Sequence, residues 1–247
     1  KNAIEYENFS AYWNAAAAAE NAKSEKAAAG NATLNNVNLC IKKGSLNALV
    51  GAVGSGKTSL LMTFTGEMPK TVGSMRYNGS IAFVEQEPTI FAGTFRENVT
   101  FGRPYEAEFY KTVVKACNLE SDLKLFPQGD LSEIGEKGNN LSGGQKARLA
   151  LARAVYSQAD IYLLDDPLSA VDPKVARSIF GNAIETVLKG KTVLLTTHQV
   201  DFARGCENII LMEDGNVLGS GTYEELKQQN IDVDKVFGNK NNRTEEE

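Results

Sequence analysis

A glycine-rich stretch between an apolar segment and a helical segment constrains the fold of this chain most. Residues Gly51–Thr58 read GAVGSGKT and follow a mostly apolar run at Leu46–Val50. The spacing matches G-x-x-x-x-G-K-[ST], in which glycines let the backbone wrap closely around phosphate groups. The N–H groups at the start of the next helix, expected at 57–65, attract anions. The stretch therefore predicts a phosphate-binding loop, with Lys57 at the β- and γ-phosphates and Thr58 at Mg²⁺.

Apolar strand segments alternate with helical segments along the rest of the chain. This alternation predicts an α/β fold with a mainly parallel sheet. We expect strands at 4–13, 33–41, 46–50, 81–84, 161–164 and 193–196, helices at 57–65, 106–125 and 142–157, and a late hairpin at 209–212 and 216–220.

The composition divides the chain into one domain and two short biased segments. Residues 1–238 are expected to form the domain, and the polar tail at 239–247 reads as the start of a linker. The alanine-rich stretch at 14–31 has too few large apolar residues to build a core. It fits either a weakly helical surface insertion, since alanine favours helix, or a disordered segment.

The charge and the cysteines exclude several classes of protein. A net charge of −5 argues against a nucleic-acid partner, although local basic loops can still bind a nucleotide. The three cysteines have neither a disulfide framework nor zinc-ligand spacing, so reduced thiols are expected. Neither a signal peptide nor an apolar run of about 20 residues is found, so we expect that this chain does not itself cross a membrane.

A second set of polar residues follows another apolar strand. The segment Ile161–Leu164 is followed by Asp165 and Asp166 and then by a proline. In enzymes with this type of phosphate loop, an aspartate at such a strand end holds Mg²⁺. A strand that simply ends in polar turn residues is the plain alternative, but it is less probable beside a phosphate loop. Asp165 is therefore the predicted metal ligand.

The string LSGGQ at Leu141–Gln145 carries a specific resemblance. It resembles the signature motif of ABC ATPases, and its small residues at a helix start also present N–H groups to an anion. Further strings occur in the order of that family: Gln86 resembles the Q-loop glutamine, Ser169–Asp172 the D-loop and His198 the switch histidine. The strings around Glu97–Gly102, Lys115–Cys117 and Asp165–Asp172 are most similar to the ABCC, or multidrug-resistance-protein, subfamily, and within it to the first of two nucleotide-binding domains.

This resemblance implies a fold, a site and its ligands. The implied fold has a P-loop ATPase core, an antiparallel β subdomain and a helical subdomain at about 87–157 that carries the signature. The implied ligands are ATP and Mg²⁺. Catalytic roles fall on Gln86, Asp166 and His198, metal binding on Thr58, Gln86 and Asp165, and nucleotide binding on Trp13, Gly51, Gly54, Ser55, Gly56, Lys57, Thr58, Ser59, Ser142, Gly143, Gly144 and Gln145. Trp13 resembles the aromatic residue that stacks on adenine, and a tryptophan packed in the core is its alternative.

One residue departs from the family pattern. Most ABC ATPases have a glutamate after the magnesium aspartate, where it orients the attacking water, whereas this chain has Asp166. The side chain is one methylene shorter, and general-base catalysis requires hydrogen-bond reach. Slow hydrolysis is therefore expected at the chain's own phosphate loop.

In the family two such domains pair head to tail, so the signature at 142–145 would complete the partner's site. The expected setting is the cytosolic face of a membrane, within an integral membrane protein. The expected partners are a second nucleotide-binding domain of the same polypeptide and transmembrane domains contacted through intracellular helices near Phe101, with no nucleic acid.

Two functions are compatible with these residues. The first is ATP-driven export of organic anions, conjugates or drugs. The alternative is a nucleotide sensor that gates a channel or regulates a partner. A third class, ABC ATPases that act on DNA or ribosomes, is disfavoured by the acidic charge and by the absence of sustained heptads between Lys57 and Leu141.

Overall fold

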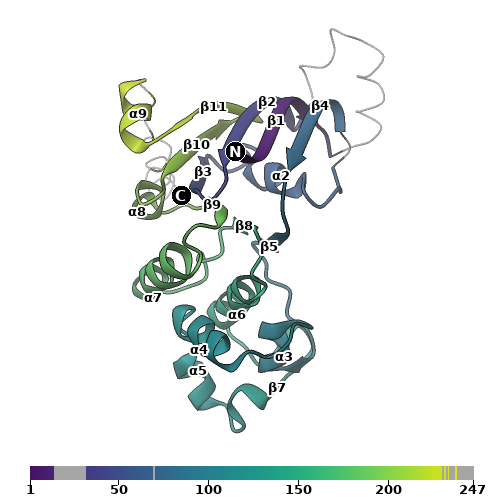
Figure 1. Cartoon of the computed structure of the whole chain (residues 1–247), viewed down its shortest axis with the longest axis vertical. Coiled ribbons are helices and arrows are strands. Elements are labelled where there is room, and N and C mark those ends of the chain that lie inside the picture. Colours follow the sequence, from purple (N-terminus) through teal and green to yellow (C-terminus); the bar gives the residue numbers. More distant parts are fainter. Residues whose placement is uncertain (14–31, 69, 230, 232, 234–236, 238–247) are drawn as a thin grey trace, which may run out of the picture. The chain divides into compact units, whose positions relative to one another are not determined.

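The structure, a computed structural model, describes residues 1–13, 32–68, 70–229, 231, 233 and 237 (Figure 1). The predicted alanine-rich insertion at 14–31 and the predicted linker at 239–247 lie outside these residues. The chain divides into two compact units, which we call the first unit (1–78 and 194–247) and the second unit (79–193). Each unit is described by itself.

The first unit combines an antiparallel sheet with a parallel strand pair. The antiparallel sheet has the strand order β2-β1-β4, and β10 pairs in parallel with β3 and antiparallel with β11. The elements of this unit are β1 (Asn2–Ala11), β2 (Leu34–Lys42), β3 (Leu46–Gly51), α2 (Lys57–Met62), β4 (Lys70–Tyr77), α8 (Val200–Arg204), β10 (Asn208–Glu213), β11 (Asn216–Gly221) and α9 (Tyr223–Gln228). β9 (Thr192–Thr196) ends in this unit, next to β3 in the strand order.

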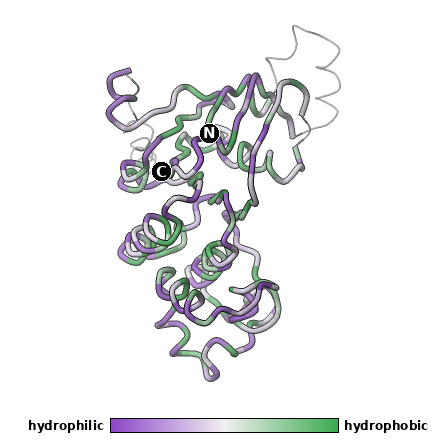
Figure 2. Tube along the Cα trace, viewed as in Figure 1, coloured by the Kyte–Doolittle hydropathy of each residue, from purple (hydrophilic) through white to green (hydrophobic). Residues whose placement is uncertain are grey.

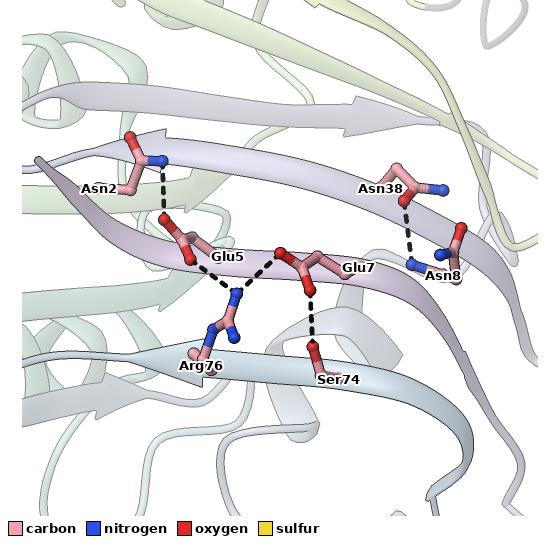
Figure 3. A network of polar contacts seen from close by, with 7 residues as sticks. All are labelled: Asn2, Glu5, Glu7, Asn8, Asn38, Ser74 and Arg76. Carbon is pink, nitrogen blue, oxygen red and sulfur yellow. Dashed lines mark hydrogen bonds and ion pairs between the residues drawn. The ribbon is translucent and has the colours of Figure 1, made fainter.

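The antiparallel sheet carries polar pairs on its exposed face. Arg76 Nη2 lies 2.7 Å from Glu7 Oε1 and 3.3 Å from Glu5 Oε2, and Ser74 Oγ donates to Glu7 (Figure 3). Exposed ion pairs of this kind typically contribute less than about 1 kcal/mol each. The sheet is therefore stabilised mainly by its opposite face, where residues such as Ile4, Tyr6, Phe9, Val37 and Leu39 are buried.

A buried tyrosine connects this sheet to the helix after the glycine-rich loop. The Tyr6 hydroxyl of β1 lies 2.7 Å from Thr63 Oγ1, and it donates to the carbonyl oxygen of Leu60 at 3.3 Å. Burial raises the pKa of Tyr6 above its usual value, so the hydroxyl stays protonated. Through these contacts the antiparallel sheet positions the C-terminal end of α2.

The second unit contains a parallel strand pair and most of the helices. β5 pairs in parallel with β8, and the helices carry both hydrophobic and hydrophilic residues (Figure 2). The elements are β5 (Ile81–Val84), β6 (Gly93–Thr94), α3 (Phe95–Thr100), α4 (Ala107–Ala116), α5 (Glu120–Leu125), η1 (Gly129–Leu131), β7 (Glu133–Ile134), η2 (Glu136–Gly138), α6 (Gly143–Tyr156), β8 (Ile161–Asp165), α7 (Pro173–Ile179) and the π-helix η3 (Phe180–Val187). Parallel strands, an antiparallel sheet and helices in these two units confirm the predicted α/β fold class.

The helix expected at 106–125 is interrupted. Asn118 adopts a left-handed conformation with φ of 55°, and Leu119 N–H donates to the Val114 carbonyl oxygen at 2.9 Å. Together with the bond from Asn118 N–H to Lys115, this is the Schellman arrangement that ends helices. The chain therefore forms α4 and α5 as two separate helices.

Cys40, Cys117 and Cys206 form no disulfide with one another, and burial raises the pKa of Cys117 to about 12. That thiol is therefore protonated at neutral pH. Among the described residues, no helix has the length and apolar character needed to span a membrane.

Candidate nucleotide-binding site

The glycine-rich loop joins β3 to α2 in the first unit. Gly54 and Gly56 have φ values of 85° and 102°, in the left-handed region that glycine adopts at little cost. The Lys57 ammonium folds back over the loop and donates to the carbonyl oxygens of Gly51 and Ala52, each at 2.8 Å. Lys57 is only 8% exposed. The loop thus holds a positive charge at its centre, an arrangement suited to a phosphate group.

Three further predicted site residues lie close to this loop in sequence or in space. Thr58 is exposed at the first turn of α2, and Ser59 follows it with a buried side chain. The Trp13 indole N–H donates to Ser59 Oγ at 3.0 Å, although α2 lies more than forty residues further along the chain. Trp13 is 49% exposed, so the alternative that it is packed in the core is wrong. Its ring remains available beside the loop.

The two aspartates and the predicted Q-loop glutamine share one sheet edge in the second unit. Val84 of β5 lies opposite Leu164 of β8 in a parallel register. Gln86 and Asp166 therefore both come two residues after that pair, at the carboxyl ends of neighbouring strands. Asp165, at the end of β8, is 4% exposed, whereas Gln86 is exposed.

The segment after β8 begins with an unusual backbone conformation. Asp166 has φ of 44°, a left-handed value that aspartate tolerates better than most residues. Its carbonyl oxygen accepts hydrogen bonds from the Ser169 N–H at 3.2 Å and from Ser169 Oγ at 3.0 Å. This turn fixes the backbone of Asp166 and thereby the direction in which its side chain extends from the end of β8.

The signature residues form the start of α6 in the same unit. Ser142 Oγ accepts from the Gln145 N–H at 3.2 Å, and Gln145 Oε1 accepts from the Ser142 N–H at 2.8 Å, which is a capping box. A Cβ atom on Gly144 would lie 3.1 Å from the carbonyl oxygen of Ala170. Gly143 is exposed and its own added Cβ would also meet Ala170. The predicted signature and D-loop segments are therefore in close contact.

A buried ion pair behind the signature was not anticipated from the sequence. Gln145 Nε2 donates to Asp122 Oδ1 at 2.9 Å, and Arg148 Nη1 lies 2.8 Å from Asp122 Oδ2. Arg148 Nε also donates to the Gly144 carbonyl oxygen. Arg148 Nη2 donates to Asp122 Oδ1 at 3.2 Å, whereas Oδ2 has no hydrogen bond among the described residues and interacts with Nη1 electrostatically. The Glu120–Leu125 helix thus fixes the side chain of Gln145. This contact depends on packing between distant segments, so the sequence around Gln145 does not indicate it.

His198 lies two residues beyond the end of β9 and is half-buried. The predicted site residues are divided between the two units. Those in the first unit are Trp13, Gly51, Gly54, Ser55, Gly56, Lys57, Thr58, Ser59 and His198, and those in the second are Gln86, Ser142, Gly143, Gly144, Gln145, Asp165 and Asp166.

An aromatic groove lies on the second unit, and its lining does not include the residues predicted for nucleotide binding. Phe91 and Phe101 are 42% and 57% exposed, and their ring centroids are 4.9 Å apart. Both rings contact the Arg153 guanidinium, at 4.8 and 5.2 Å from its central carbon. The groove has a volume of about 260 Å³ and is lined by Phe83, Glu85, Pro88, Phe101, Arg153 and Ala154 among others.

Arg153 is held in place by backbone oxygens. It donates to the carbonyl oxygens of Thr89 and Asn98 at 2.7 and 2.9 Å and to Asn98 Oδ1 at 2.8 Å. Burial lowers its pKa to about 10, which still leaves the guanidinium charged at neutral pH. The sequence analysis predicted a contact with intracellular helices near Phe101, but it did not identify Phe91 or Arg153.

Comparison with known families decides what kind of protein this is. The sequence model of the family described as "ABC transporter" matches residues 34–169, more than half of the 247 residues. The chain belongs to the ABC transporter family. The match covers the glycine-rich loop, the signature and both aspartates of this ABC transporter domain.

Individual relatives narrow the family. The domain is 50% identical to "ABC transporter C family member 9" of Arabidopsis thaliana over 206 aligned residues, and this alignment covers 83% of the chain. It is 42% identical over 246 residues to "ATP-binding cassette sub-family C member 4" of Homo sapiens, which covers 100% of it. It is 48% identical over 227 residues to "Multidrug resistance protein mrp-7" of Caenorhabditis elegans, which covers 91%. These matches confirm the resemblance of this ABC transporter domain to the ABCC subfamily. The chain spans 14–18% of the length of these relatives.

Proposed function

We propose that this domain binds ATP with Mg²⁺ at the loop Gly51–Ser59 and hydrolyses it slowly. The observation that carries the proposal is the Lys57 ammonium, which a glycine-rich turn holds by two carbonyl oxygens at 2.8 Å. A triphosphate can replace those carbonyl contacts with stronger charge-assisted ones. Trp13 is half exposed and hydrogen-bonded to Ser59, so its indole ring can stack on the adenine.

The residues that we assign to Mg²⁺ carry donor atoms suited to this ion. Thr58, Gln86 and Asp165 offer a hydroxyl, an amide and a carboxylate oxygen, which are the hard donors that this ion prefers. When bound, Mg²⁺ neutralises charge on the phosphate oxygens. We assign to Gln86 and His198 the orientation of the attacking water and of the terminal phosphate. Asp166 accepts the water's proton, and its short side chain limits the rate.

Titration of the chain with ATP tests this function. We expect ATP to bind in the presence of Mg²⁺ and to raise the unfolding temperature, because a ligand that binds only the folded state stabilises it. AMP, which lacks the β- and γ-phosphates that Lys57 contacts, is expected to bind at least about tenfold more weakly, a difference of about 1.4 kcal/mol. Calorimetry with both nucleotides measures the ratio, and equal affinities would contradict a triphosphate site.

The signature extends the proposal to a partner domain. Ser142, Gly143, Gly144 and Gln145 are distinct from the residues proposed for the domain's own ATP, and Ser142 and Gly143 are exposed. We assign them to the ATP site of a second nucleotide-binding domain in the same polypeptide, with this chain as the first domain. Shared ATP then draws the two domains together, and hydrolysis releases them. The whole protein would use this cycle for transport at the cytosolic face of a membrane.

The aromatic groove is the proposed contact for the transmembrane domains. Exposed aromatic residues around a fixed cation are typical of an interaction site. An intracellular helix of the membrane part can place apolar side chains on Phe91 and Phe101 and an acidic or carbonyl group near Arg153.

A substitution in the full-length protein tests this contact. Phe101→Ser is expected to reduce ATP-dependent transport at least about tenfold, because burying a phenylalanine side chain contributes about 1.5–3 kcal/mol. ATP binding by the variant should stay within twofold of the unsubstituted protein, because Phe101 is not part of the nucleotide site. Leu125→Ser, at a residue that is 80% exposed on another helix of the same unit, is the control. Equal transport by the two variants would argue against the groove.

A further inference from the structure

The turn of the β10–β11 hairpin contacts the glycine-rich loop. The Gly215 N–H donates to the carbonyl oxygen of Ser55 at 3.0 Å, and both residues are buried. Three residues earlier in the chain, Met212 lies opposite Gly51 in the parallel pair of β10 and β3, and its carbonyl oxygen occupies the space that a Gly51 side chain would need. The hairpin therefore touches the loop near its start and at its centre.

The same turn is held from the other side by the start of β2. The Asn35 N–H donates to the Gly215 carbonyl oxygen at 2.9 Å. Gly215 has φ of 76°, and a Cβ atom there would collide with the carbonyl oxygen of Thr33. Gly215 is thus enclosed between β2 and the loop, and its peptide groups contact both.

The packing between the turn and the loop is close. A Cβ atom on Gly56 would lie 3.4 Å from Gly215 Cα and 3.3 Å from both Leu34 Cδ2 and Met212 Cε. The space between Gly56, the residue immediately before Lys57, and the turn therefore leaves little room for a side chain.

The contact with Ser55 fixes one peptide plane of the loop. The peptide unit is planar and trans, so its C=O and N–H groups point in opposite directions. Because the Gly215 N–H holds the Ser55 carbonyl oxygen, the Gly56 N–H of the same peptide must point away from the hairpin. Main-chain N–H groups of this loop are the proposed phosphate donors, so their direction decides affinity.

We propose that Gly215 is a positioning residue for the phosphate site, which aligns the Ser55–Gly56 peptide without touching the nucleotide. This inference rests on the proposed ATP site. It assigns a role in nucleotide affinity to a turn that lies more than 150 residues after the loop and contains no phosphate-binding motif.

The test compares two glycine substitutions with the same backbone cost. Gly66 also has φ of 76° and lies in the same unit, and no atom of the described residues is within 4 Å of a Cβ added there. Gly66→Ala therefore introduces only the left-handed strain, whereas Gly215→Ala adds the collision with Thr33. We expect MgATP affinity, measured by calorimetry on the chain, to fall at least about tenfold in Gly215→Ala and less than twofold in Gly66→Ala. Amide hydrogen exchange in the 51–58 loop should rise only in Gly215→Ala.

A gentler variant covers the case in which Gly215→Ala does not fold. Asn216 Nδ2 donates to the Asp214 carbonyl oxygen at 2.9 Å and helps to close the turn. Asn216→Ala removes this bond without adding atoms, and we expect a threefold or larger loss of MgATP affinity with faster exchange in the loop. Affinity within twofold of the unsubstituted chain in every folded Gly215 and Asn216 variant would overturn the inference.

Lys57→Ala, measured beside them, separates this inference from the proposed function. If Lys57→Ala binds MgATP normally, the phosphate site itself is wrong. If Lys57→Ala loses binding while the hairpin variants keep it, only the role of the hairpin is wrong.

Discussion

Replacing Lys57 by alanine is expected to weaken the binding of MgATP by roughly 30-fold or more. The ammonium is almost fully buried in the loop and donates to Gly51 and Ala52 at 2.8 Å, so it is already oriented for an anion. Removing one partner of a buried charge pair costs about 2–5 kcal/mol. That cost corresponds to a loss of affinity of roughly 30-fold to several thousand-fold. Calorimetric titration with a non-hydrolysable ATP analogue measures the change.

Two further variants separate the charge from other effects of this substitution. Lys57→Met keeps a long apolar stem and removes only the ammonium, so it should bind as weakly as Lys57→Ala. Lys43→Ala removes an exposed lysine from the turn between β2 and β3, and it should bind ATP normally. Tight binding by both Lys57 variants would show that the ammonium does not contact the phosphates.

Replacing Asp166 by glutamate is expected to accelerate hydrolysis at this domain's own site. The longer side chain brings the carboxylate within hydrogen-bond reach of the attacking water, a contribution worth about 10²–10⁴-fold. The measurement requires the full-length protein, with the residue that follows the magnesium aspartate of the second nucleotide-binding domain replaced by alanine so that only this site turns over. The steady-state rate of phosphate release then equals the rate of hydrolysis at this domain's own site.

Asp166→Ala is the matched control, because it has no carboxylate at all. We expect the rate to be far higher with glutamate than with aspartate, and lowest with alanine, which cannot accept the proton. Asp166 has φ of 44°, and a residue less tolerant of that conformation costs about 1–2 kcal/mol, so the glutamate variant should unfold at a slightly lower temperature. A rate for Asp166→Glu within twofold of the unsubstituted protein would argue against side-chain length as the limit.

The helical boundaries show where local patterns lose predictive value. Residues 106–125 have a continuous helical spacing, but Asn118 adopts a left-handed conformation and separates α4 from α5. β4 was not predicted, because Lys70–Tyr77 contains Gly73 and several polar residues, and its strand conformation depends on pairing with β1. In the first case a local helix ending and in the second a neighbouring strand supplies hydrogen bonds that the segment's own propensity does not indicate.

The sequence alone determined the strand, loop and helix around Gly51–Thr58, the two aspartates where β8 ends and the capped helix at Ser142. Each is a contiguous string in which backbone conformation and chemistry depend on neighbouring residues, so each can be read locally. Only the tertiary structure decided which distant residues support them. Trp13 reaches Ser59, Gly215 holds Ser55, Asp122 holds Gln145, and Arg153 joins two aromatic rings. These contacts depend on strand register and helix packing between segments far apart in the chain, and no local pattern encodes that geometry.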